Sequence, residues 1–343
     1  MNSPLADLGV RTPVLAAPMA GGPGTPALVV AAAQADSLGF LAAGYKDVAT
    51  LTEQIAEVRD NGVPFGVNLF VPSPQPIDPA AFQDYARAIA PEAHAHGVDV
   101  RTIGIVEDDD RWHEKIELLL SQPVPAVSFT FALPDAAVIR SLRAAGTLVI
   151  QTVTSPAEAA QAAEAGVDML IVQASAAGGH SGTFTPQHTP ASVPLPQLLA
   201  AVRHTVSLPL IGAGGLATPD QVAGALRAGA GAAMVGTALL RADEAGTSLP
   251  HRTALTAPTD RGTTVTRAFT GRPARALRNH FTERYSDLAP GGYPAVHHLT
   301  SPMRRAATAA QDPERINLWA GTGYRQTRAE STARILQGLT TTL

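Results

Sequence analysis

One pattern recurs along the chain: an amphipathic stretch, then a glycine, then a short apolar run. It is found in the segments 36–44, 59–70, 143–153, 163–174 and 227–239. A helix that ends at a glycine in the left-handed conformation and leads into a buried strand explains each copy. The chain is therefore predicted to repeat a unit of one β-strand and one α-helix.

Three more apolar segments, 14–18, 126–131 and 209–214, bring the predicted strands to eight. The strands are expected to start near residues 14, 39, 64, 126, 147, 169, 209 and 232. Most are continuous apolar runs, which is typical of parallel strands covered on both faces. Eight such units within about 225 residues favour the α/β class and a (β/α)₈ TIM barrel. An open doubly wound sheet is the alternative.

Two stretches do not follow the repeat. Residues 71–125 are too long for one crossover and are expected to form a helical insertion. Its two helical patterns are Pro79–His96 and Asp110–Leu120. Residues 240–312 are expected to form a smaller lid or substrate region, with helical pieces around 260–285 and 301–310. The predicted division is a barrel over 1–239, this lid, and a C-terminal segment over 313–343 that returns to the barrel.

Composition and charge exclude several classes of protein. The formal net charge is −4, and no block of like charges provides the basic footprint of a nucleic-acid-binding protein. Cysteine is absent, which excludes disulfides and thiolate chemistry and fits a reducing cytoplasm. The N-terminal residues lack a secretory pattern, and no apolar run is long enough for a membrane span. A cytoplasmic protein that does not bind membranes is predicted.

Metal-binding patterns are weak. His94 and His96 are two positions apart on a predicted helix, so they do not share a face. The acidic run Glu107–Asp110 lies at a predicted helix start, where carboxylates suit the positive end of the helix dipole. We interpret this run as a helix cap and expect no metal.

Two glycine-bearing loops follow the last two predicted strands. The first, GAGG, contains Gly214 and Gly215 and leads into a predicted helix with Thr218 as its cap; the second contains Gly236 and Thr237. Backbone amides of such loops, together with a helix N-terminus, form the phosphate-binding cup of this fold. The spacing therefore predicts a phosphate site.

Polar residues at other strand ends extend this prediction. Asn68 and Gln173 are amides that end apolar strands, where a buried amide needs a partner. With a phosphate cup in the same barrel mouth, they favour a mononucleotide cofactor. His180 stands among three glycines in the loop after the sixth strand, so its imidazole is expected to lie over a ligand as a base or an anion holder.

At these residues the chain resembles the nitronate monooxygenase family, formerly called 2-nitropropane dioxygenases. The resemblance covers nearly the whole chain and is carried by the segments APMAGG, PFGVNLF, VSFTFALP, QASAAGGHSG, IGAGG, MVGT, GYPAVHHL and WAGTG. It implies an enzyme that uses FMN and O₂ to oxidise alkyl nitronates, such as propionate 3-nitronate, to a carbonyl compound and nitrite.

The resemblance also implies residue roles. His180 would be the base or anion holder. The residues expected to bind FMN are Pro18, Met19, Ala20, Asn68, Gln173, Gly178, Gly179, Gly214, Gly215, Gly236 and Thr237. Those expected to approach the substrate are Thr130, His298 and Thr322.

The chain departs from the family pattern at three positions, Ala176, Thr322 and Thr130, which are expected on the substrate side. Two other functions stay open: an NAD(P)H-dependent flavin reductase of the enoyl-acyl carrier protein reductase or quinone reductase type, and a barrel that only binds a phosphate ligand. A homodimer is a further option.

Overall fold

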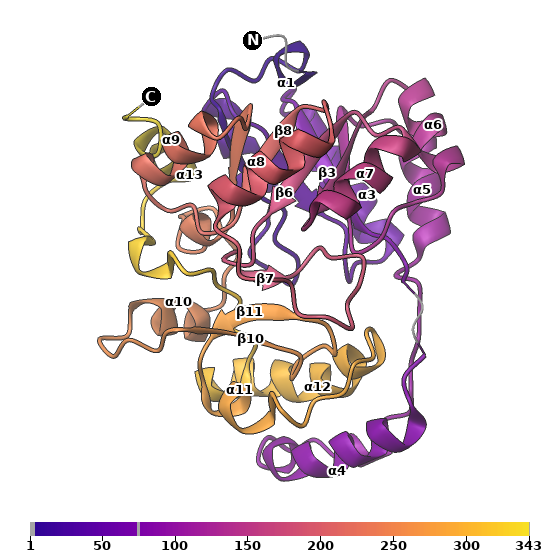
Figure 1. Cartoon of the computed structure of the whole chain (residues 1–343). Coiled ribbons are helices and arrows are strands. Elements are labelled where there is room, and N and C mark those ends of the chain that lie inside the picture. Colours follow the sequence, from indigo (N-terminus) through magenta and orange to yellow (C-terminus); the bar gives the residue numbers. More distant parts are fainter. Residues whose placement is uncertain (1–3, 74–75, 343) are drawn as a thin grey trace.

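The computed structural model describes residues 4–73 and 76–342, and its main body is a closed barrel of parallel strands (Figure 1). Around the barrel the strands are β1 (Val14–Ala16), β2 (Gly39–Ala42), β3 (Phe65–Phe70), β4 (Ala126–Thr130), β5 (Leu148–Val153), β6 (Met169–Gln173), β8 (Leu210–Ala213) and β9 (Ala232–Val235). Pairing of β1 with β9 closes the ring. The predicted α/β barrel is confirmed, and the open sheet is wrong.

A ring of helices covers the barrel. Its members are α2 (Pro26–Gln34), α3 (Val48–Asp60), α5 (Trp112–Ser121), α6 (Ala136–Ala144), α7 (Pro156–Ala165), α8 (Leu195–Thr205), α9 (Pro219–Arg227) and α13 (Thr332–Gly338), and α1 (Pro4–Asp7) precedes the first strand. Local signals set their ends: Thr218 and Gln221 form a capping box at the start of α9, and Gly166 ends α7 in the left-handed conformation. Because side chains alternate along each strand, one apolar set fills the barrel interior and the other packs under the helices.

The stretch 71–125 contains one helix outside the barrel and one within its ring. α4 (Pro79–His94) and the short 3₁₀ helix η1 (Val100–Thr102) lie beside the lid, whereas α5 packs between α3 and α6. The prediction that Glu107–Asp110 cap this last helix is wrong. Arg111 is the N-cap, and its side chain has no acceptor for a helix amide. Asp110 instead accepts the amide of Tyr45 and pairs with Lys115.

The lid consists of two strands and three helices. These are α10 (Leu249–Thr256), β10 (Thr263–Thr266), β11 (Ala274–Leu277), α11 (His280–Tyr285) and α12 (Ala295–Ala309). The helix expected within 301–310 is confirmed as part of α12. Of the helical pieces expected around 260–285, α11 is found at the end of the range, but the rest of the expectation is wrong. The β-branched run 263–266 pairs with β11, and β11 pairs with β7 (Gly179–His180).

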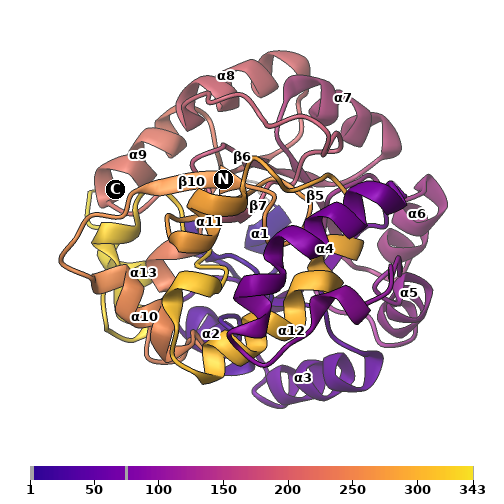
Figure 2. The same ribbon diagram turned by 90° about the horizontal axis from the view of Figure 1, so that it is seen from below.

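The lid covers the barrel mouth. In Figure 2, α4, α11 and α12 lie across the centre of the helical ring. α4 and the lid share one apolar core, in which Phe82 and Tyr85 pack with Phe269 and Phe281. Three short 3₁₀ turns, η2 (Thr237–Leu239), η3 (Pro313–Arg315) and η4 (Tyr324–Gln326), lie along the path from β9 through the lid to α13. Within the described residues, no helix is both long and apolar enough to cross a membrane.

Candidate active site

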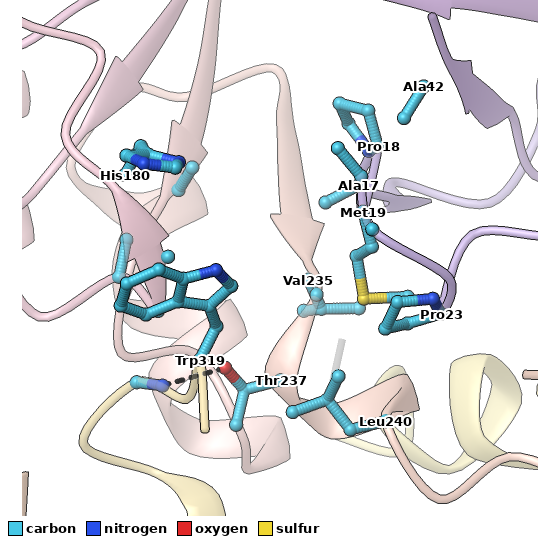
Figure 3. A pocket seen from close by; sticks show the side chains of 18 of the residues that line it. Ala17, Pro18, Met19, Pro23, Ala42, His180, Val235, Thr237, Leu240 and Trp319 are labelled. Atoms are coloured by element: carbon cyan, nitrogen blue, oxygen red, sulfur yellow. Dashed lines mark hydrogen bonds between the residues drawn. The ribbon is translucent and has the colours of Figure 1, made fainter. Parts of the chain in front are cut away.

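A cavity of about 310 Å³ opens at the carboxyl ends of the barrel strands, and we call it the inner cavity (Figure 3). It brings together most residues selected from the sequence. Those that line it are Pro18, Met19, Ala20, Asn68, Thr130, Gln173, Gly178, Gly179, His180, Gly214, Gly215, Gly236 and Thr237. His298 and Thr322 are not among its lining residues. Segments far apart in the sequence thus meet in one chamber, as expected for the mouth of a TIM barrel.

His180 stands in an aromatic wall. Its ring centroid lies 5.5 Å from that of Phe131, 5.9 Å from that of Tyr293 and 5.3 Å from that of Trp319. The strand pairing of β7 with β11 fixes its backbone. Burial among these rings, together with the nearby cations Arg272 and Arg304, lowers the pKa of His180 to about 3. The imidazole is therefore neutral at pH 7.

The contact of His180 with Thr270 favours one tautomer. Nε2 lies 2.9 Å from the Thr270 hydroxyl, and that hydroxyl donates to the carbonyl of Arg272 at 3.4 Å. A hydroxyl has one proton, so while it donates to this carbonyl its oxygen accepts from Nε2–H. Nδ1 then has the free lone pair and is the basic nitrogen.

Arg272 holds the loops on both sides of His180. It is 1% exposed, and its guanidinium donates to the carbonyls of Phe131, Ser181 and Thr183 while lying 3.9 Å from the centroid of the Phe131 ring. Burial lowers its pKa to about 9, which leaves it charged at neutral pH. Sequence reasoning missed this residue. The available signal was an arginine between Gly271 and Pro273 in an otherwise lid-like stretch.

The two predicted amides play different parts. Gln173 donates to the carbonyl of His180 at 3.2 Å and accepts the amide of Gly182 at 2.7 Å, so it braces the histidine loop. Asn68 accepts the hydroxyls of Ser128 and Thr130 through Oδ1, each at 2.9 Å. These bonds fix its orientation, and no described residue accepts a hydrogen bond from its Nδ2. Asn68 therefore presents a buried donor to the inner cavity, whereas Thr130 mainly orients it.

A backbone cradle forms the opposite end of the cavity. Gly214 and Gly215 have φ values of +107° and +77°, and a Cβ on Gly214 would lie 2.7 Å from the Ala174 carbonyl oxygen. The Thr237 hydroxyl accepts the amide of Gly321 at 2.9 Å, shown as a dashed line in Figure 3. This contact joins the last barrel loop to the returning C-terminal segment. The cradle is rich in backbone groups and leaves no room for a side chain at Gly214, as suits an anion-binding loop.

Two of the family departures lie at this cradle. A Cβ on Gly215 would be 3.0 Å from Cβ of Ala176 and 3.4 Å from Oγ1 of Thr322. The Thr322 amide also donates to the Ala176 carbonyl at 3.1 Å. The return of 319–323 to the glycine loops thus places both residues beside the predicted phosphate end, and their expected approach to the substrate stays a prediction.

The two lid histidines, His297 and His298, make different contacts. His298 Nε2 is 2.8 Å from an oxygen of Asp108, on the rim. The ring of His297 stacks on that of Tyr45 with centroids 4.1 Å apart and planes 1° from parallel. Tyr45 lines the inner cavity, so His297 comes near the chamber through this stack. No group of three potential metal-ligating side chains occurs among the described residues.

These features define a class of protein: a TIM-barrel enzyme with a partly buried, neutral histidine facing a glycine cradle across one cavity. The family model described as nitronate monooxygenase matches residues 2–342, and the chain belongs to this family of oxidoreductases.

Similar proteins agree with this assignment. The chain is 33% identical to a probable nitronate monooxygenase of Staphylococcus saprophyticus, covering 92% of this chain and 89% of the other. It is 31% identical to one of Bacillus subtilis, covering 98% and 97%. Among solved structures, a nitroalkane oxidase from Streptomyces ansochromogenes matches with a TM-score of 0.93 and 44% identity, covering 98% and 97%. FabK from Thermotoga maritima matches with a TM-score of 0.74 and 25% identity, covering 99% and 95%.

Proposed function

We propose that the chain is an FMN-dependent nitronate monooxygenase that uses O₂ to oxidise alkyl nitronates, such as propionate 3-nitronate, to a carbonyl compound and nitrite. The observation that carries the proposal is the inner cavity itself, in which a neutral histidine faces a glycine cradle. Membership in the family supports flavin-dependent nitronate oxidation, and the similarity to a nitroalkane oxidase supports a nitro-compound substrate.

The residues present fit FMN. The cradle of Gly214, Gly215, Gly236 and Thr237 would offer backbone donors to a phosphate, with no side-chain bulk at its three glycines. Asn68 offers an unpaired buried amide donor, which suits the polar edge of a flat heteroaromatic ring. Pro18, Met19 and Ala20 would lie along one face of that ring, and Gly178 and Gly179 would face its ribityl chain. When bound, FMN would supply the electron chemistry that no side chain can provide.

His180 would act on the substrate. Its neutral imidazole has a basic nitrogen for the α-proton of a nitroalkane, and an already formed nitronate would need only its orientation beside the aromatic wall. Arg272 holds the carbonyls on either side of this loop and adds positive charge near an anionic substrate. The aromatic rings exclude water, which strengthens these interactions.

The experiment that tests the proposal is anaerobic mixing of the purified holoenzyme with a nitronate and, separately, with NADH. Bleaching of the flavin by the nitronate, followed by nitrite release in air, is the expected result. Bleaching by NADH alone would favour a second candidate, an NAD(P)H-dependent flavin reductase. A colourless protein that takes up no FMN would favour a barrel that only binds a phosphate ligand.

A further inference from the structure

Glu158 is a buried carboxylate that no step of the proposed chemistry uses. It lies in the first turn of α7, is 6% exposed, and does not line the inner cavity. Each of its oxygens accepts a backbone amide, from Thr154 at 2.5 Å and from Phe184 at 2.8 Å, as the oxygens of an ionised carboxylate do. A buried charge is costly unless other groups compensate it, so its place in the molecule needs a reason.

The two oxygens of Glu158 serve different parts of the molecule. Oε2 accepts the amide and the hydroxyl of Thr154, just before α7, and stabilises the start of its own helix. Oε1 instead accepts the hydroxyl of Thr183 at 2.8 Å together with the Phe184 amide. Both of these residues follow His180 in the loop after β7. One carboxylate therefore ties the beginning of α7 to the histidine loop.

Thr183 connects this carboxylate with Arg272. The Thr183 hydroxyl donates to Glu158, while its carbonyl accepts Nη2 of the Arg272 guanidinium. Within the described residues, the hydrogen bonds of both charged groups go to neutral partners. Burial lowers the pKa of Arg272 to about 9, and the negative charge of Glu158 opposes this decrease. Thr183 thus lies between the buried cation and a carboxylate that compensates its charge.

Arg272 contacts the surroundings of His180 in two ways. Its guanidinium binds the carbonyl of Phe131 and lies over the ring of that residue, which packs against the imidazole. Its backbone carbonyl accepts from the Thr270 hydroxyl at 3.4 Å, and the same hydroxyl is 2.9 Å from Nε2 of His180. If Arg272 shifts, the Thr270 hydroxyl is free to donate to Nε2, and the other tautomer of His180 becomes available.

We propose that Glu158 is a positioning residue for the reaction: through Thr183 it anchors Arg272, and so keeps the imidazole of His180 in one orientation and one tautomer. Neither Glu158 nor Thr183 lines the inner cavity, so the carboxylate acts without touching the substrate. Gln173 braces the same loop from the end of β6, so losing the anchor should weaken the reaction rather than abolish it. The inference rests on the proposed function, in which His180 acts on the substrate.

Two matched substitutions separate this role from the stabilisation of α7. Thr183→Val removes the hydroxyl that joins Glu158 to the histidine loop, whereas Thr154→Val removes a hydroxyl that donates to the same carboxylate at the helix start. Each variant loses one hydrogen bond to Glu158, so a role in folding alone should affect both alike. Urea denaturation measures that effect.

Two further variants test the anchor itself. Thr183→Ser restores the hydroxyl and should recover the wild-type behaviour. Glu158→Gln removes the charge and should change His180 in the same direction as Thr183→Val. If Glu158→Gln does not fold, the two threonine variants decide the question.

The first readout is the tautomer of His180, observed by ¹⁵N NMR of the histidine-labelled holoenzyme and assigned by comparison with His180→Asn. The wild type should show one protonated and one unprotonated ring nitrogen, with the proton on Nε2. Thr183→Val should shift both signals towards their average, because the two tautomers then exchange. Thr154→Val should match the wild type. This readout requires no turnover.

The second readout compares nitroethane with ethyl nitronate, two forms of one compound that differ by the α-proton. Thr183→Val should lower kcat for nitroethane by about 3- to 10-fold, the usual worth of one hydrogen bond, with KM nearly unchanged. For ethyl nitronate, from which no proton has to be removed, kcat should change little. Thr154→Val should change neither value.

Two results would overturn the proposal. One is a single Nε2–H tautomer together with unchanged kcat in Thr183→Val. The other is an equal change in Thr183→Val and Thr154→Val, which would assign Glu158 to folding alone. If the wild type oxidises ethyl nitronate but not nitroethane, the NMR comparison decides by itself. A wild type that oxidises neither would overturn the proposed function, while the NMR comparison would still show whether Glu158 positions His180.

Discussion

The two ends of the inner cavity are built in different ways. The cradle end consists of backbone from the loops after β8 and β9, where Gly214, Gly215, Gly236 and Thr237 follow their strands directly. The lid end consists of side chains, among them Tyr293 and Trp319, that come from segments distant in the sequence. The difference shows that the cradle end is built locally from backbone, whereas the lid end depends on how distant segments dock; under the proposed function, the first would bind the phosphate and the second would contact the substrate.

The largest effect is expected at the lid end, where His180 stands in the aromatic wall. His180→Asn should keep a normal flavin spectrum and lose turnover of nitroalkanes by a factor of roughly 10² or more, the scale of a positioned acid or base. Steady-state nitrite production and the flavin absorption spectrum measure both properties. His188→Asn, an exposed histidine further along the same loop, is the matched control and should have wild-type activity. Unchanged turnover in His180→Asn would remove this residue from the chemistry.

A substitution in the cradle should affect the cofactor first. Gly214→Ala places a Cβ 2.7 Å from the Ala174 carbonyl at a φ of +107°, so the loop must shift. The dissociation constant of FMN should rise by about tenfold or more, the equivalent of about 1.4 kcal/mol, as measured by fluorescence titration of the apoprotein. Gly224→Ala in α9, where a Cβ meets no atom within 4 Å, is the control. FMN affinity that is equal in both variants would contradict a phosphate site at this loop.

The same division explains what could be predicted from the sequence. Periodicity and helix-ending glycines locate all eight barrel strands to within one residue of their starts, because these signals are local. The cradle glycines could also be predicted, because they come directly after the strand ends and are therefore local in the sequence as well. Arg272 and Tyr45 could not be found in this way, since their roles depend on contacts with Thr183 and with His297, far away in the chain. The hairpin of β10 and β11 was missed because its pairing with β7 is also non-local.

A smaller effect is expected from a lid side chain that is buried in neutral form. His251 lines the inner cavity, and burial lowers its pKa to about 4 although the backbone of Trp319 bonds to it. The ordinary pKa of histidine is 6.5. When the pH falls below this value, His251 takes up a proton in the unfolded chain but not in the folded chain. Stability should therefore be full above pH 6.5 and should fall as the pH drops towards 4.

The comparison of wild type with His251→Gln isolates this contribution. Between pH 6.5 and 5.5 the wild type should lose about 1 kcal/mol more unfolding free energy than the variant, measured by urea denaturation at both pH values. His204→Gln, on the exposed face of α8, should leave the pH dependence of the wild type intact. Identical pH slopes in wild type and His251→Gln would show that this histidine is not held in neutral form.

The smallest effect should come from the ion pair that joins the lid to the rim. Asp108 and His298 have side chains 48% and 32% exposed, so solvent and salt screen their attraction. Asp108→Asn should lower stability by less than about 1 kcal/mol and change KM little, with the difference disappearing at high ionic strength. Thermal denaturation and nitronate kinetics at low and high salt measure both effects. A large rise in KM would mean that this exposed pair positions the lid, and that electrostatic docking at the rim, rather than the apolar core shared with α4, organises the substrate end.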